Sequence, residues 1–115
     1  SDVYKRQINQ LLDYLRSHLS SPHSLDALAS RVQMSRRTFT RHFFRATGMT
    51  VSDWLTAERL HHSQALLEST SHSIEAIADN VGFQSVVTFR QQFKQRFSVS
   101  PTDWRKTFQD KSTTC

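Results

Sequence analysis

The sequence predicts an all-α fold of about seven helices. Apolar residues recur at helical rather than alternating spacing along the chain. Only two Gly and two Pro occur among the 115 residues, so the residues on which β-hairpin turns depend are scarce. Ser or Thr also precedes most of the apolar segments, in the position of a helix N-cap.

Three helices are expected in the first half of the chain. The first spans about residues 4–19 and carries one stripe of Ile and Leu. Ser24 caps a short second helix in the segment "SLDALASRV". Ser35 caps a third helix over about 36–47, which stops at Gly48 because glycine suits the left-handed turn that follows a helix.

Four helices are expected in the second half. The longest spans about 51–69 and would form a rod of about 28 Å. Shorter helices follow at "IEAIADNV" and, over about 86–97, at "VVTFRQQFKQRF". The dipeptide Ser-Pro at 100–101 has the order of an N-cap and a first helical residue, and opens a last helix to about residue 108. Residues 110–115 are expected to form a disordered tail.

One phrase of the sequence occurs twice. The segments "VQMSRRTFTRHF" at 32–43 and "VGFQSVVTFRQQF" at 81–93 share their Val, Ser, Thr-Phe and final Phe. Each copy comprises a short helix, a tight turn with a large apolar residue (Met34 or Phe83) and a capped helix, which is the layout of a helix-turn-helix. The apolar residues of the second helices are expected to be buried: Phe39, Phe43, Ala46, Phe89 and Phe93.

The free faces of these two helices indicate the function. At helical spacing the first face holds Arg37, Thr40, Arg41, Phe44 and Arg45. The second holds Val87, Arg90, Gln91, Lys94 and Gln95. Arg pairs with guanine edges, Gln with adenine edges, and apolar groups touch the thymine methyl. A merely solvated basic face is the alternative, but the same face occurs in both copies of the motif and neither copy carries an acidic residue there.

Composition agrees with a polyanionic partner and limits the other classes. The net charge is +5 and the pI is about 10.0, which suits nucleic acid or an anionic membrane surface, although a merely soluble basic protein has the same balance. A single cysteine, Cys115, excludes an intramolecular disulfide and fits a reducing compartment. No apolar run is long enough to span a membrane, and no signal peptide is visible.

Three rival functions are weaker. An enzyme needs a nucleophile, a base and an orienting group, and no Gly-flanked Ser elbow or phosphate loop occurs. No two of the six His have the i, i+3 or i+4 spacing of a metal site on a helix, so neither metal nor cofactor is expected. A membrane or partner-binding amphipathic helix leaves the duplicated turn unexplained. RNA binding lacks an aromatic platform on strands.

The chain resembles the DNA-binding domain of AraC/XylS-type transcription regulators. The most specific stretch is "IEAIADNVGFQSVVTFRQQFKQRFSVSPTDWR", and "ERLHHSQALLEST" is similar to the family's linker helix. The resemblance covers roughly residues 8–108. It implies one DNA-binding domain over 1–109, made of helix-turn-helix units at about 4–48 and 73–108 with a linker helix at about 51–69 between them. Recognition helices at about 36–47 and 86–97 would enter successive major-groove segments of double-stranded DNA, about 34 Å apart.

The resemblance also implies individual roles. Base contacts are expected from Arg37, Thr40, Arg41, Val87, Thr88 and Gln91. Phosphate contacts are expected from Ser35, Arg36, Arg45, Ser85, Arg90 and Lys94. No catalytic residue, metal or cofactor is implied.

Partners follow from the same resemblance: double-stranded DNA and RNA polymerase, but no membrane. The domain is expected to act as a monomer in the bacterial cytoplasm, in a regulator of the activator type. We expect the chain to be part of a longer protein that dimerises through an N-terminal domain, because it lacks an initiator Met. The segments "VSDWLTAERL" and "PTDWRKTF" resemble the branch fused to a glutamine-amidotransferase-like domain.

Three positions depart from the family pattern. Gln91 stands where Arg is frequent, Phe44 where Lys is usual, and Ser98 where Gly is common. Gln91 predicts weaker DNA binding by the second unit, and Phe44 predicts one phosphate contact fewer in the first unit. The third is expected to affect only a helix end. The first unit is therefore expected to be the stronger electrostatic anchor.

Overall fold

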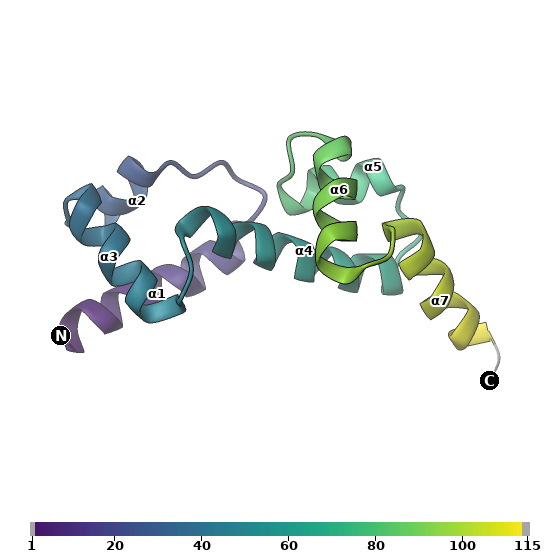
Figure 1. Ribbon diagram of the computed structural model, residues 1–115, viewed down its shortest axis with the longest axis horizontal. Helices are drawn as coiled ribbons and strands as arrows, with labels where there is room; N and C mark the ends of the chain where they lie inside the picture. Colours follow the sequence, from purple (N-terminus) through teal and green to yellow (C-terminus); the bar gives the residue numbers. More distant parts are fainter. Residues whose placement is uncertain (1, 114–115) are drawn as a thin grey trace. The chain divides into compact units, whose positions relative to one another are not determined.

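The computed structural model describes the backbone of residues 2–113 and the side chains of residues 3–109. Within this range the chain forms helices and no strand, which confirms the all-α class (Figure 1). In chain order the helices are α1 (Asp2–Ser17), α2 (Leu25–Arg31), α3 (Arg36–Thr47), α4 (Val51–Ser69), α5 (Ile74–Val81), α6 (Val86–Phe97) and α7 (Pro101–Thr113).

The chain divides into two compact units. Unit 1 is Ser1–Glu58 and unit 2 is Arg59–Cys115, so the boundary falls inside α4. The first turns of α4 contribute Val51, Trp54 and Leu55 to the core of unit 1. Its later turns contribute Leu60 and Leu67 to the core of unit 2. The linker helix is therefore structural in both units and is more than a spacer.

Unit 1 is held together by apolar faces of four helices. α1 packs against α3, and α2 packs against the same helix. The predicted stripe on α1 is buried together with Phe39 and Phe43 of α3 and Trp54 of α4. Met34 packs against this core from the turn between α2 and α3, as predicted. The core thus fixes α3 by one face and leaves the opposite face free.

Unit 2 repeats this arrangement with other elements. α6 packs against both α5 and α7. Phe89 and Phe93 are fully buried, and Phe83 packs against them from the turn between α5 and α6. Trp104 of α7 also packs against this core. α6 is therefore held by the same kind of buried face as α3.

The repeat extends further than the matching phrase in the sequence suggested. Ring centroids of Phe39 and Phe43 lie 5.8 Å apart, and those of Phe89 and Phe93 lie 5.7 Å apart. Phe43 meets Trp54 at 6.0 Å with nearly perpendicular planes, and Phe93 meets Trp104 at 6.0 Å in the same way. The copies therefore continue into the first turns of α4 and α7.

Helix caps repeat as well. Ser35 and Ser85 each accept a hydrogen bond from the backbone amide three residues on, at 3.2 and 3.3 Å. Ser24 and Ser73 do the same for α2 and α5. Because each cap satisfies an amide that lacks a helical partner, the serines define where the helices begin.

Within residues 2–113 the backbone is left-handed at four places, and glycine occupies only two of them. Between the helices of each motif the left-handed residue is Gln33 (φ 58°) in unit 1 and Gly82 (φ 107°) in unit 2. At the ends of α3 and α6 it is Gly48 (φ 72°) and Ser98 (φ 69°). The departure at Ser98 lies at a helix end, as predicted, and its left-handed backbone makes that end strained. Gln33 is a second strained position.

Gln33→Gly is expected to stabilise unit 1, because glycine adopts φ 58° without the steric cost that a side chain brings. The larger entropy of glycine in the unfolded chain offsets part of the gain, so the free energy of unfolding should rise by about 0.5 kcal/mol. Urea denaturation measures it. The control is Ser30→Gly, inside α2, which should destabilise instead. A loss of stability in Gln33→Gly would contradict the strain.

Two residues of α7 bind the end of α4. The Arg105 guanidinium donates to the backbone carbonyls of Leu67 and Thr70, both at 3.2 Å, and the Trp104 indole donates to the Glu68 carboxylate at 3.0 Å. The last turn of α4 has no basic residue of its own, so Arg105 brings the positive charge that a helix C-terminus favours.

Two predictions about the elements were wrong. Ala46 is exposed, because its methyl group is too short to close the space between α3 and α1. The last helix extends to Thr113 rather than 108, since no Pro or Gly follows Phe108 to stop it. Of the predicted tail, 110–113 are thus helical and 114–115 lie outside the described residues.

Candidate nucleic-acid interface

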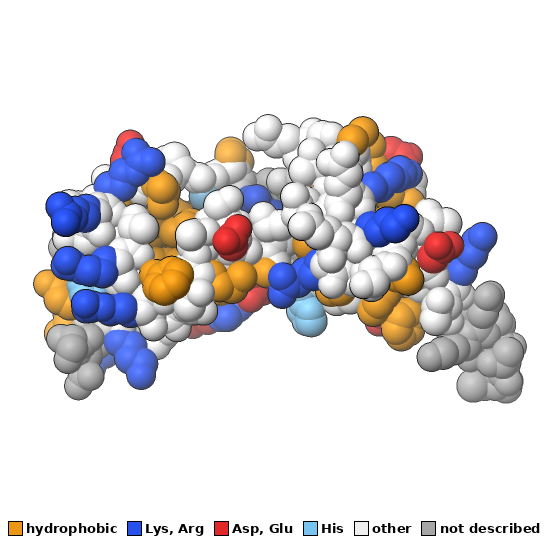
Figure 2. All heavy atoms as spheres, viewed as in Figure 1, with side chains coloured by type: hydrophobic (Ala, Val, Ile, Leu, Met, Phe, Trp, Pro, Cys, Tyr) orange, Lys and Arg blue, Asp and Glu red, His pale blue; other side chains and the backbone are white. Residues whose placement is uncertain are grey.

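The free face of α3 is basic and fully accessible. The six residues predicted to contact DNA in unit 1 are all exposed: Ser35, Arg36, Arg37, Thr40, Arg41 and Arg45. They are positioned by Phe39 and Phe43, which are buried on the opposite side of the helix. Lys and Arg side chains gather over α3 in the space-filling view (Figure 2). Unit 1 therefore presents a helix whose free face is rich in arginine.

Two contacts modify this face. Arg36 lies 3.8 Å from the carboxylate of Asp26 on α2, but both side chains are largely exposed, so the pair is weak and leaves Arg36 available. The Thr40 hydroxyl donates to the backbone carbonyl of Arg36 at 2.8 Å. Because its proton is used within the helix, Thr40 offers a partner its oxygen lone pairs and its methyl group rather than a donor.

The free face of α6 is also accessible but carries less charge. The six predicted residues of unit 2 are all exposed: Ser85, Val87, Thr88, Arg90, Gln91 and Lys94. Val87 is 61% exposed, which is large for an apolar side chain near a helix start. Arg90 donates to the Glu75 carboxylate on α5 at 3.5 Å, and this exposed pair competes only weakly with an outside anion.

The two recognition helices differ in positive charge. α3 carries four arginines and α6 carries three basic residues, and neither helix contains an acidic residue. At equivalent positions, Arg37, Arg41 and Arg45 of α3 correspond to Val87, Gln91 and Gln95 of α6. Unit 1 therefore carries more of the positive charge that attracts a polyanion. Unit 2 presents more uncharged side chains at the equivalent positions.

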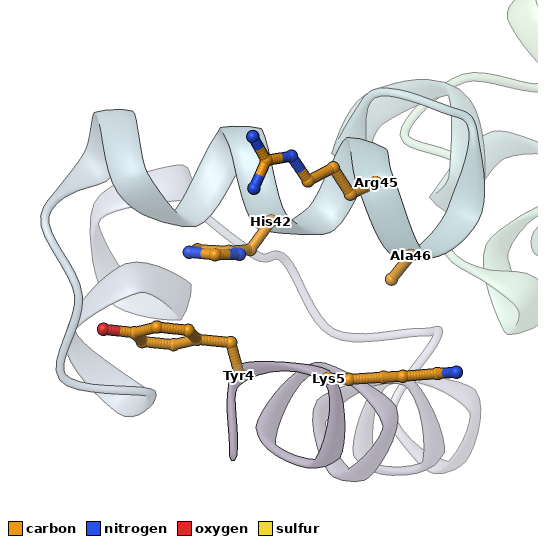
Figure 3. Close-up of a pocket in the computed structure, with 5 residues that line it drawn as sticks. All are labelled: Tyr4, Lys5, His42, Arg45 and Ala46. Atoms are coloured by element: carbon orange, nitrogen blue, oxygen red, sulfur yellow. The ribbon is translucent and has the colours of Figure 1, made fainter. Parts of the chain in front are cut away.

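A pocket between α1 and α3 adjoins the basic face. It is lined by Tyr4, Lys5, His42, Arg45 and Ala46 (Figure 3). The ring of Tyr4 stacks on the His42 imidazole, with centroids 4.3 Å apart and planes inclined by 21°. Partial burial lowers the pKa of His42 below its usual value of 6.5, and the nearby charges of Arg41 and Arg45 lower it further. The stack of His42 on Tyr4 thus joins α3 to α1.

Acidification is expected to weaken unit 1 through His42. Its pKa is lower in the folded than in the unfolded chain, so the unfolded chain binds the proton more tightly. Stability present above the unfolded pKa of 6.5 is lost as the pH falls toward the folded value. Between about pH 7.5 and about pH 5.5, the melting temperature of the wild type should fall more than that of His42→Gln. Equal falls in both proteins would refute this role.

The stack of Tyr4 on His42 was not predicted, because the two residues lie on different helices and no local pattern joins them. The partners of the acidic residues Asp26 and Glu75 were not predicted either, although these two acids occupy matching positions in the repeat.

No group of His, Cys, Asp or Glu among the described side chains could hold a metal ion. Nor does any helix in the described part of the chain have the length and apolar character needed to cross a membrane.

Two units that each display an exposed, capped second helix over a buried aromatic core define a helix-turn-helix protein with a duplicated motif. A family model described as a helix-turn-helix domain matches residues 28–107. The chain belongs to this family, the AraC-type helix-turn-helix DNA-binding domains.

Curated relatives agree with this assignment. The Msm operon regulatory protein of Streptococcus mutans is 29% identical over 106 residues, which are 92% of this chain and 38% of the relative. The HTH-type transcriptional activator RhaR of Salmonella arizonae is 31% identical over 98 residues, or 85% of this chain and 35% of the relative. The chain thus spans little more than a third of these proteins.

Solved structures match nearly the whole chain. The DNA-binding domain of AdpA, a global transcriptional factor crystallised with a target DNA, has a TM-score of 0.87 and 32% identity, covering 90% of this chain and 94% of that one. An AraC-type transcriptional regulator from Chromobacterium violaceum has a TM-score of 0.84 and 26% identity, covering 94% and 96%.

Proposed function

We propose that this chain recognises a specific duplex sequence by laying α3 and α6 into successive major-groove segments. The observation that carries the proposal is the pair of matching helices, each capped by serine, seated on a buried phenylalanine pair and free of acidic residues. The similarity to the AdpA domain, whose structure contains a target DNA, supports it. Successive segments on one side of B-DNA are about 34 Å apart, which the two units together would have to span.

Within this proposal the side chains divide into two roles. Base edges are read by Arg37, Thr40, Arg41, Val87, Thr88 and Gln91. Phosphates are held by Ser35, Arg36, Arg45, Ser85, Arg90 and Lys94. Unit 1 supplies most of the electrostatic attraction, because its helix has the larger charge. Unit 2 contributes more through uncharged groups, among them Val87 and Gln91.

For the whole protein we propose a cytoplasmic transcription regulator that acts without catalysis or a cofactor of its own. The relatives are regulators about three times as long as their matched part, which supports further segments that sense a signal or dimerise. The proposal includes contact with RNA polymerase. It also includes binding of this domain as a monomer to an asymmetric site, and a footprint over two inverted half-sites would contradict that point.

The decisive experiment is a binding selection on random duplexes. A single preferred, asymmetric sequence is the expected result. The selected duplex should bind at least about 10³-fold more tightly than a scrambled one at the same salt concentration. Anionic phospholipid vesicles are the comparison, and tighter binding to vesicles than to the selected duplex would overturn the proposal.

Lys94→Ala should reduce the log–log salt dependence of binding to the selected duplex by about one unit, because one phosphate contact is lost. The matched control is Lys106→Ala, an exposed lysine on α7 outside both faces, which should leave the slope unchanged. Filter binding at several salt concentrations measures both. An unaltered slope in Lys94→Ala would remove this residue from the set of phosphate contacts.

A further inference from the structure

Phe44 is a large apolar side chain in an unusual place. Its side chain is 55% exposed, although the other two phenylalanines of α3 are fully buried. Among the described residues its ring takes part in none of the aromatic contacts, which instead join Phe39, Phe43 and Trp54. The equivalent position in unit 2 is Lys94. Packing in the core therefore does not explain Phe44, and a charged residue occupies its position in the other copy.

The position of Phe44 is that of a base reader. Residues 37, 40, 41 and 44 are spaced i, i+3, i+4 and i+7, so they share one face of α3. A recognition helix that lies along the major groove reads bases with this same spacing, as the homeodomain does. Phe44 also lines one open depression on α3 with the residues to which base or phosphate contacts are assigned: Arg36, Arg37, Thr40, Arg41 and Arg45.

The chemistry of the ring selects the group it would meet. A phenyl ring neither donates to nor accepts from the polar atoms of base edges. The apolar group that bases expose in the major groove is the 5-methyl of thymine. Thr40 lies one helical turn before Phe44 and, with its hydroxyl proton donated to the Arg36 carbonyl, presents its methyl group. The ring of Phe44 and the methyl group of Thr40 thus belong to the same depression that Arg41 and Arg45 line.

We propose that Phe44 determines specificity by packing on a pyrimidine 5-methyl group, so that unit 1 makes a base contact where Lys94 of unit 2 is proposed to hold a phosphate. This inference rests on the proposed insertion of α3 into the major groove. Phe44 acts with Arg41 in the same groove: arginine attracts and orients the duplex, and the ring discriminates thymine from the other bases.

The test uses the duplex selected with the wild-type chain, with each thymine replaced in turn by deoxyuridine, which lacks the methyl group. At one position covered by α3, wild-type affinity should fall about fourfold, the loss expected when one CH₂-sized group is no longer buried. Phe44→Ala should bind the thymine and uracil duplexes equally at that position. It should still discriminate at positions read by other residues. 5-Methylcytosine there should bind the wild type more tightly than cytosine does.

The matched control is Val87→Ala, which removes the exposed apolar side chain of α6 and should alter discrimination at a different thymine. Circular dichroism should show the wild-type fold for both variants, because both side chains are exposed. Unchanged discrimination in Phe44→Ala would overturn the proposal. A Phe44→Lys variant that keeps the discrimination, and gains affinity for all duplexes with a steeper salt dependence, would also overturn it. If the wild type itself preferred no duplex, the proposed function would fail instead.

Discussion

Phe93→Ala is expected to reduce the free energy of unfolding of unit 2 by about 3–5 kcal/mol. Phe93 is fully buried and its ring meets those of Phe89, Phe97 and Trp104 at centroid distances of 5.7, 4.7 and 6.0 Å. Truncation leaves a cavity at the centre of the aromatic cluster that holds α6 against α7. Because both helices lose the same support, the recognition face of unit 2 should lose its rigidity.

Hydrogen exchange resolved by residue measures this effect. Amides of α5, α6 and α7 should exchange faster, while those of α1 to α3 keep their protection, because the core of unit 1 contains no residue of unit 2. Phe43→Ala, the equivalent change in unit 1, should give the reverse pattern. Phe93→Leu, which retains much of the volume, provides a milder variant if the alanine variant does not fold. Uniformly faster exchange in both units would contradict two separate cores.

Arg41→Ala is expected to weaken binding to the selected duplex by about 1–3 kcal/mol, or roughly 5- to 150-fold. Arg41 is exposed on the middle of the α3 face and makes no ion pair with the described acidic side chains. Nothing within the unit therefore competes for its guanidinium, which can form two parallel hydrogen bonds with a guanine edge. The loss should be accompanied by relaxed preference at one base pair.

The equivalent variant in unit 2, Gln91→Ala, is the control for position. It should relax preference at a different base pair and change the salt dependence little, because a neutral side chain releases no counterion. Equilibrium titration of the selected duplex and its single-base variants separates the two residues. If Arg41→Ala lowered affinity equally for every duplex, Arg41 would be a phosphate contact.

Most of the helical framework could be predicted from the sequence because its determinants are local. Serines at the caps, apolar residues at helical spacing and Gly48 after α3 each act on the nearest turn, and the structure confirms the helices that they mark. The duplicated motif could be recognised because its buried residues must pack in the same way in both copies. The twelve predicted contact residues are exposed for the same reason, since they fill the positions that the core leaves over.

Features that join distant segments could not be predicted in this way. The sequence contains Tyr4 and His42 but nothing that pairs them, and only the packing of α1 on α3 stacks the two rings. Ala46 matched the buried spacing but is exposed, since burial depends on the reach of the neighbouring helix as well as on the face. Arg105 ends the stretch that is most specific to the family, and only the fold makes it a partner for the carbonyls at the end of α4.

The sequence by itself determined where each helix starts, which side of it is apolar and which residues are left for a partner. Those properties depend on backbone hydrogen bonds and side-chain periodicity within a few residues. Tertiary structure alone decided that α4 is shared between two cores, that Asp26 and Glu75 engage Arg36 and Arg90, and that Tyr4 stacks on His42. These outcomes depend on which surfaces meet, and that is a property of the packed chain rather than of any one segment.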